Sequence, residues 1–144
     1  MSDTTQLTLL IVLLFPIAFA AIWFGVMWIL SFAGGWHALG TRYAHPRPIP
    51  ESARTGISGM VGWVGYNHVL RIASTDQYLY LDVLAPFRPG HSALRIPWRD
   101  IEVLGNARWP RRHFQRLQVG RPPLATLTLP ELQLARPSLA AGLR

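Results

Sequence analysis

The chain has 144 residues, of which seven are acidic and fourteen are basic, and every basic residue is an arginine. The formal net charge of +7 suits anionic lipid headgroups, acidic proteins or nucleic acid as binding partners. Cysteine is absent, which excludes disulfide bonds and thiolate metal ligands, and the length allows one small domain beside a membrane segment.

The first predicted element is a membrane helix. The run from Leu7 to Ala33 contains no charged side chain, and it is longer than the roughly 20 residues that a helix needs to cross a bilayer core. A cleaved signal peptide is the main alternative, but no positive charge precedes the run, which is also too long for a signal-peptide core. We therefore predict a transmembrane anchor over residues 1–35, ended by Gly34 and Gly35.

The charges beside this helix predict its orientation. No lysine or arginine precedes Leu7, whereas three arginines follow the helix within 21 residues: Arg42, Arg47 and Arg54. The positive-inside rule then predicts a single-pass protein of the bacterial inner membrane, with the N-terminus outside and the C-terminal domain in the cytoplasm. Trp36, Arg42 and Tyr43 lie just beyond the helix, and we expect them at the membrane interface.

A second feature of the helix is the pair Ala21 and Gly25. Two small residues four positions apart can seat another transmembrane helix. The alternative is a chance spacing in a helix that contains several alanines. The pair is therefore a candidate packing site for a larger membrane complex.

Residues 36–56 form the predicted interfacial segment and proline-rich linker. Pro46, Pro48 and Pro50 alternate with other residues, and this pattern favours an extended polyproline path. We expect a stiff spacer that holds the following domain away from the lipid headgroups.

Residues 57–144 predict a small, mainly-β domain of about seven strands, as a partly open barrel or sandwich with a short C-terminal helix. The expected strands are Ile57–Val64, His68–Ser74, Tyr78–Val83, Ala93–Pro97, Ile101–Ala107, Gln115–Val119 and Ala125–Leu129. Turn signals separate them, including Gly65–Asn67. In Tyr78–Val83 the alternation turns the apolar residues inward and Asp82 outward. The expected core is Trp63, Leu70, Ile72, Leu79, Leu81, Ile96, Ile101, Val103, Leu117 and Leu127.

Seven strands followed by a helix is the element order of pleckstrin-homology-like domains. The segments Tyr78-Leu79-Tyr80-Leu81 and Ile96-Pro97-Trp98-Arg99-Asp100-Ile101 resemble bacterial (GRAM-like) members of that group. The whole chain also resembles uncharacterised bacterial proteins with one membrane helix and an FRPGH…IPW…I segment, here Phe87 to Ile101. The resemblance covers roughly residues 57–143. It implies a binding or scaffolding module and carries over no catalytic residue.

The strongest candidate site is a basic stretch between two of the predicted strands. It combines arginines with a tryptophan, and the residues that we expect to bind lipid or a partner are Arg108, Trp109, Arg111, Arg112 and Arg116. Arginines can bind lipid phosphates while a tryptophan enters the interface. The alternative is a solvated loop with one aromatic side chain folded onto the core. A membrane tether makes nucleic acid an unexpected partner.

Enzymatic chemistry is not indicated. The five histidines are scattered without metal-site spacing, and phosphate-binding, nucleophile-elbow and zinc-protease motifs are absent from the sequence. We therefore expect no enzyme, no cofactor and no metal. The predicted function is a membrane-anchored binding or scaffolding domain that contacts anionic membrane lipids or a partner protein. The alternative is an accessory subunit of a photosynthetic or respiratory complex, with its helix packed on other helices and its domain capping the cytoplasmic face.

Overall fold

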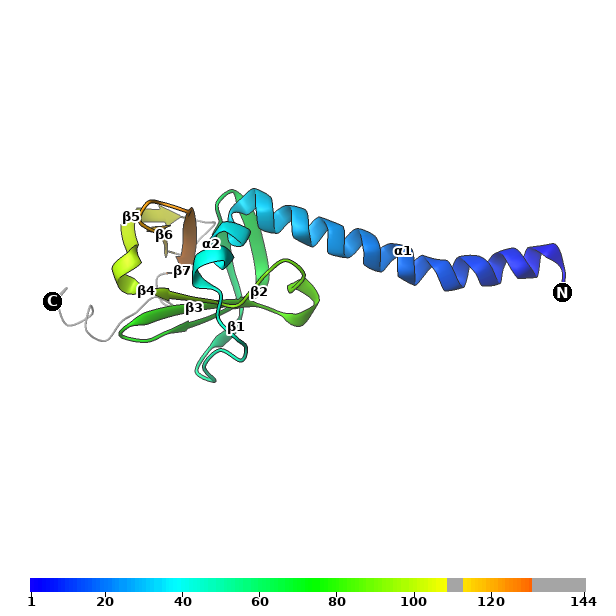
Figure 1. Ribbon diagram of the computed structural model, residues 1–144, viewed down its shortest axis with the longest axis horizontal. Coiled ribbons are helices and arrows are strands. Elements are labelled where there is room, and N and C mark those ends of the chain that lie inside the picture. Colours follow the sequence, from blue (N-terminus) through cyan, green and yellow to red (C-terminus); the bar gives the residue numbers. More distant parts are fainter. Residues whose placement is uncertain (109–112, 131–144) are drawn as a thin grey trace.

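The computed structural model describes residues 1–108 and 113–130 of the chain. A long helix, α1 (Asp3–Gly34), projects from a small domain, and a short helix, α2 (Trp36–Tyr43), connects the two (Figure 1). Within the described ranges, the domain contains seven strands in one antiparallel sheet. The expected C-terminal helix lies outside these residues.

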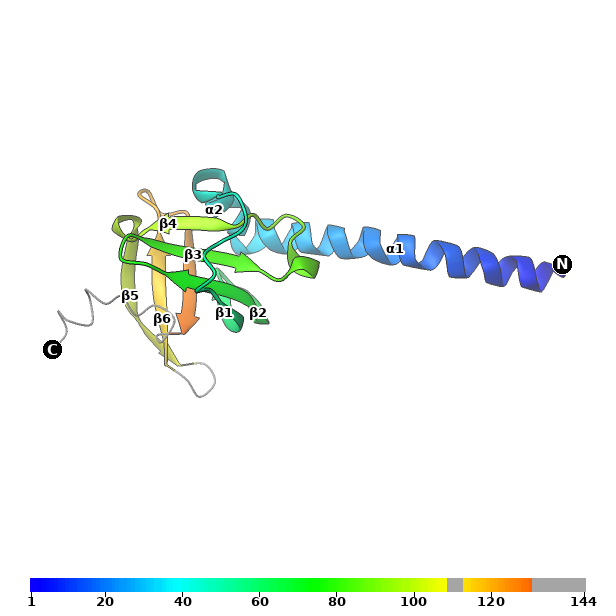
Figure 2. The same ribbon diagram turned by 90° about the horizontal axis from the view of Figure 1, so that it is seen from below.

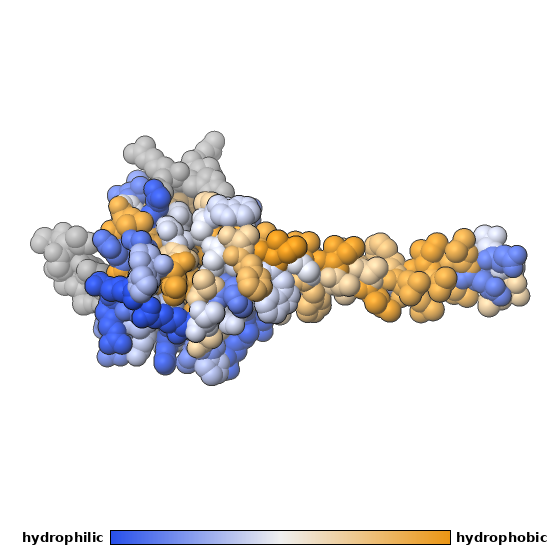
Figure 3. All heavy atoms as spheres, turned by 45° about the horizontal axis from the view of Figure 1, so that its top comes forward, coloured by the Kyte–Doolittle hydropathy of each residue, from blue (hydrophilic) through white to orange (hydrophobic). Residues whose placement is uncertain are grey.

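Helix α1 is long and apolar enough to span a membrane. Ser2 caps its N-terminus, where the Ser2 hydroxyl accepts a hydrogen bond from the backbone N–H of Thr5 at 3.3 Å, and Asp3 lies in the first turn, where a negative charge is favourable. It ends at Gly35, which adopts the left-handed conformation with φ +95°. The projecting part is covered by exposed apolar side chains (Figure 3).

All seven predicted strands are confirmed. Their bounds are β1 (Arg54–Val61), β2 (Val64–Ser74), β3 (Tyr78–Val83), β4 (Leu94–Pro97), β5 (Ile101–Arg108), β6 (His113–Val119) and β7 (Ala125–Pro130). Two short 3₁₀ helices, η1 (Ala85–Phe87) and η2 (Trp98–Asp100), interrupt the order. The expected turn at Gly65–Asn67 is wrong, because these residues belong to β2. The chain instead reverses at Gly62 and Trp63, where Gly62 supplies a positive φ of 58°.

The sheet curves into a half-barrel (Figure 2). Its strand order is β4-β3-β2-β1-β7-β6-β5, so β4 and β5 are the two edges. Only the three residues of η2 separate these edge strands in the chain. The sheet must therefore bend until its edges approach, although no ladder closes it between β4 and β5 in the part of the chain that the structure describes.

Helix α2 contributes three side chains to the core of the half-barrel. Trp36 and Leu39 have no exposed surface and Tyr43 is 6% exposed, and all three belong to the main apolar core. Their i, i+3, i+7 spacing puts them on one helix face. The Tyr43 hydroxyl donates a hydrogen bond to Asp100 Oδ2 at 2.9 Å, which ties α2 to η2 between the two sheet edges. The domain core is therefore completed by residues that precede the sheet.

Seven of the ten expected core residues are buried, and Ile101 packs against them half-buried. Two expectations are wrong. Trp63 is 70% exposed because it lies at the β1–β2 turn rather than inside a strand. Val103 is paired with Leu117 but remains 57% exposed, because β5 is an edge strand with a neighbour on one side only.

Candidate functional site at the helix–domain junction

The last three turns of α1 are part of the domain rather than a free stalk. The loop between β3 and β4 lies along the helix, where the Trp23 indole N–H donates to the carbonyl of Pro86 at 2.6 Å. One turn apart on the same side, Met27 is buried and the Ser31 hydroxyl donates to the carbonyl of Gly90. These contacts fix the direction in which α1 leaves the domain.

Two glycines allow the end of α1 to approach the sheet closely. A side chain at Gly62, in the β1–β2 turn, would collide with the carbonyl oxygen of Gly34. A side chain at Gly34 would lie 2.8 Å from the carbonyl oxygen of Val61, which is also too close. Glycine is required at both positions because backbone meets backbone there.

The proline-rich segment does not act as a spacer, so that expectation is wrong. His45 donates its backbone N–H to the carbonyl of Ala93 at 2.8 Å, and Ala44 forms a β-bridge with Leu94. Ile49 is buried, with 3% of its surface exposed. The segment packs against the domain because its backbone pairs with the start of β4 and Arg47 pairs with Asp82 on β3.

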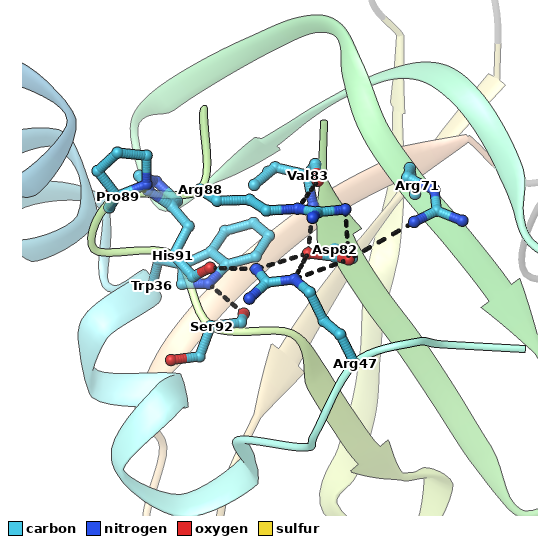
Figure 4. A network of polar contacts seen from close by, with 9 residues as sticks. All are labelled: Trp36, Arg47, Arg71, Asp82, Val83, Arg88, Pro89, His91 and Ser92. Atoms are coloured by element: carbon cyan, nitrogen blue, oxygen red, sulfur yellow. Dashed lines mark hydrogen bonds and ion pairs between the residues drawn. The ribbon is translucent and has the colours of Figure 1, made fainter. Parts of the chain in front are cut away.

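The polar centre of the junction is Asp82. Its side chain has no exposed surface, and the guanidiniums of three arginines lie within 4 Å: Arg47 at 2.9 Å, Arg71 at 3.7 Å and Arg88 at 3.9 Å (Figure 4). Arg47 also donates from Nε to both carboxylate oxygens at 3.2 Å, and the backbone N–H of Val83 donates to Oδ1 at 2.8 Å. Asp82 points to the outer face of the sheet as predicted, but the arginines cover it.

A buried histidine supports the same loop. His91 is 1% exposed, and its Nδ1 lies 2.9 Å from the carbonyl of Pro89, which can only accept. Nδ1 therefore carries the proton, and Nε2 accepts a hydrogen bond from the Tyr66 hydroxyl at 2.7 Å. Burial lowers the pKa of His91, the hydrogen bond to Pro89 opposes this, and the charge of Arg47 lowers it further. A neutral imidazole thus braces the β3–β4 loop.

These elements line an open cavity of about 330 Å³ between α1, α2 and the Arg88–Ser92 loop. Arg47 and Arg88 form its basic wall, and Trp28 forms an aromatic wall that is backed by the buried Trp36. The Trp36 indole donates to the carbonyl of Ser92 at 2.9 Å, which holds that loop in place (Figure 4). The cavity is suited to bind a small anion with an apolar neighbour.

The structure separates the predicted site residues into three groups. Trp36 and Tyr43 are buried in the domain core rather than exposed as a place among lipid headgroups requires, since Trp36 has no exposed surface and Tyr43 is 6% exposed. Arg42 is exposed and donates to the carbonyl of Arg121 at 3.3 Å. Ala21 and Gly25 lie on an exposed face of α1, with open space beside Gly25.

The basic stretch is described in part. Arg108 ends β5, and Arg116 is exposed on β6, whereas Trp109, Arg111 and Arg112 lie outside the described residues. The strands β5 and β6 lie at the end of the domain opposite to the projecting part of α1 (Figures 1 and 2).

Sequence reasoning missed the Asp82 network. Its members come from the linker, β2, β3 and the loop after β3, so no local spacing joins them. One signal was available: Asp82 is a charged residue near the end of an otherwise apolar and aromatic strand, shortly before a segment that contains arginine and prolines.

A scan of family models and searches of curated proteins and solved structures found no match to this chain. The resemblance to pleckstrin-homology-like domains therefore stays a prediction. Among residues 1–108 and 113–130, no group of three histidine or acidic side chains is placed to hold a metal ion.

Proposed function

We propose that this chain is a non-enzymatic binding domain held in a fixed orientation on the bacterial inner membrane, with the N-terminus outside and the domain in the cytoplasm. The observation that carries the proposal is the packed junction, in which α1, α2 and the sheet share one core. A flexible tether would suit a domain that searches for a ligand. A rigid junction instead suits a domain that presents one surface at a set height and angle.

The basic stretch from Arg108 to Arg116, comprising Arg108, Trp109, Arg111, Arg112 and Arg116, is the proposed binding surface; of these, Arg108 ends β5 and Arg116 lies on β6. Arg116 is exposed there, and both strands lie away from the projecting part of α1 (Figure 2). If α1 spans the bilayer, this placement favours an acidic protein surface over the lipid of the same membrane. Arginine suits such a surface because its planar guanidinium pairs with carboxylates through two hydrogen bonds.

The test uses the full chain in native membranes, extracted with mild detergent and run on a native gel. We expect the wild-type chain to migrate with a larger assembly, and the R111E/R112E variant to leave it. The control is R54E/R99E, which reverses two charges at exposed positions elsewhere on the domain. If both variants migrate with the assembly as the wild type does, this surface is excluded as the contact. If the wild-type chain binds acidic vesicles and R111E/R112E abolishes that binding, the surface is assigned to lipid.

A second candidate function is the accessory subunit. It is favoured by the apolar face of α1 that stays exposed beside the domain, where Trp28 is 45%, Ile29 is 67% and Phe32 is 59% exposed. In this case the helix, with Ala21 and Gly25, makes the main contact with the complex. Gly25→Leu should then release the chain from the assembly while R111E/R112E should not, so the two variants distinguish the two functions.

A further inference from the structure

We propose that the junction cavity, bounded by Arg47, Arg88, Trp28, Trp36 and Ser92, binds a phosphate ester anion, which for a membrane-anchored chain is the headgroup of an anionic phospholipid. This site is separate from the basic stretch between Arg108 and Arg116. The outcome of the test described below is therefore independent of the partner-binding function proposed above.

The first argument is charge. Asp82 contributes one negative charge, and the guanidiniums of three described arginines lie within 4 Å of its carboxylate, which leaves two positive charges in excess. The carboxylate is fully buried, whereas the side chains of Arg47 and Arg88 are 32% and 36% exposed. Of the three arginines, Arg47 and Arg88 line the cavity, so its wall presents two partly exposed guanidiniums beside one buried carboxylate and is net positive.

The second argument is the freedom of Arg88. Arg47 is held by several hydrogen bonds of 2.6 to 3.2 Å to Asp82 and to the carbonyl of His91. The contacts of Arg88 are longer, at 3.3 Å to the carbonyl of Val83 and 3.9 Å to Asp82. Arg88 can therefore turn toward an anion at little cost while Arg47 keeps the structure intact. A guanidinium matches a phosphate group in shape and charge.

The third argument is the position of the cavity along the helix. Roughly 20 residues cross a bilayer core, so a core that begins at Leu7 ends near Val26. Trp28, which lines the cavity, lies two residues farther on, and tryptophan is favoured at that depth. The cavity thus opens at the level of the lipid phosphates, beside an apolar helix face along which an acyl chain can lie.

The wall chemistry agrees with this assignment. Trp28, packed in front of the buried Trp36, excludes water from one side, which strengthens the attraction between the arginines and an anion. Ser92, exposed at the opening, adds a hydroxyl group. A zwitterionic headgroup would bring its own cation next to the arginines, so an anionic phosphodiester is the better ligand.

The experiment uses the purified full chain in mild detergent with two probes. Native mass spectrometry measures retention of phosphatidylglycerol against phosphatidylcholine, and thermal unfolding measures the effect of glycerol 1-phosphate as a soluble phosphate ester. The variant is Arg88→Gln, and the matched control is Arg54→Gln, which removes the same charge at an exposed position at the start of β1. Ser92→Asp is a second variant that places a carboxylate at the opening and leaves the Asp82 contacts unchanged.

We expect wild type and Arg54→Gln to retain one phosphatidylglycerol and Arg88→Gln and Ser92→Asp to bind it about tenfold more weakly. A different result is that glycerol 1-phosphate stabilises the wild type and not these variants while no chain retains phosphatidylglycerol. That result supports the phosphate site and shows that its ligand is a soluble phosphate ester rather than a lipid. Equal retention of both lipids by all chains, or equal behaviour of Arg88→Gln and Arg54→Gln, would overturn the proposal.

Discussion

Asp82 is the single side chain on which the most contacts of the junction converge. It accepts from the linker through Arg47, from its own strand through Val83, and attracts Arg71 and Arg88. A buried carboxylate costs free energy unless it is paired, and here the arginines and a backbone N–H compensate it. The network therefore holds the linker and the β3–β4 loop to the sheet.

Replacing Asp82 with Asn should destabilise the domain by about 2–4 kcal/mol, because three arginines lose their shared anion and Arg47 loses its paired acceptor. This loss of unfolding free energy is at the low end of the range for breaking a buried ion pair, because the arginines are partly exposed to solvent. Thermal or denaturant unfolding of the full chain in detergent measures the change. Glu102→Gln removes a charge at an exposed position of β5 and should stay within about 0.5 kcal/mol of wild type. Equal effects of the two changes would contradict the role of Asp82.

His91 should make folding stability depend on pH. Because burial lowers the pKa of the folded imidazole below its usual value of about 6.5, the unfolded chain takes up this proton first as the pH falls. This contribution to stability is complete above pH ~6.5 and declines below it, down to the lowered pKa of the folded state. The unfolding temperature of the full chain should fall between pH 7.5 and 5, and His91→Gln should reduce that dependence. A pH dependence that His91→Gln leaves unchanged would show that another group is responsible.

At the scale of elements, α2 and the linker belong to the domain as much as the strands do. A fragment of residues 52–144 lacks Trp36, Leu39, Tyr43 and Ile49, all of which are buried in the full chain. Removing even one large buried side chain costs about 3–5 kcal/mol, comparable to the whole stability of many small domains. We expect this fragment to lack a cooperative unfolding transition.

The matched fragment is residues 35–144, which keeps α2 and the linker and drops only α1. It should show a β-dominated circular dichroism spectrum and a cooperative transition, because the described core lies almost entirely within it. In either the fragment or the full chain, Leu81→Ala should cost about 2–5 kcal/mol, since Leu81 has no exposed surface. Cooperative unfolding of residues 52–144 would show that α2 is dispensable.

The elements were predictable from the sequence where local patterns decide them. The uncharged run defines α1, and alternation with turn residues defines all seven strands. The error at Trp63 arose because Gly62 and Gly65 are equally good turn signals, and only the contact of Gly62 with Gly34 selects between them. We expected Trp36 and Tyr43 at the membrane interface, and their sequence positions alone cannot show that the domain core covers these side chains.

The candidate site was less predictable than the fold for the same physical reason. Periodicity reports which residues share a face of one element, whereas the Asp82 network joins four separate segments. The proline pattern predicted an extended segment without contacts to the domain. Its packing against the domain depends on pairing with the edge strand β4, which is far away in the sequence.

At the scale of the whole molecule, the packed junction couples the orientation of the domain to that of the helix. The β3–β4 loop and the end of α1 form one surface, with Trp23 and Phe87 in ring contact at 5.4 Å between centroids. A change in helix tilt would therefore rotate the domain with it. The side on which the domain lies is then a property that one topology experiment can decide.

We predict that the C-terminal domain lies in the cytoplasm. No lysine or arginine precedes Leu7, and Arg42, which is exposed directly after α1, is the first of several arginines on the other side of the helix. Positive charges near a membrane helix are retained on the cytoplasmic side. A green fluorescent protein fusion after Arg144 should fluoresce, and an alkaline phosphatase fusion at the same position should be inactive. Inserting three arginines before Leu7 is the matched control, because it reduces the charge difference across the helix and should shift part of the population. An active phosphatase fusion to the unaltered chain would place the domain outside and refute the proposed orientation.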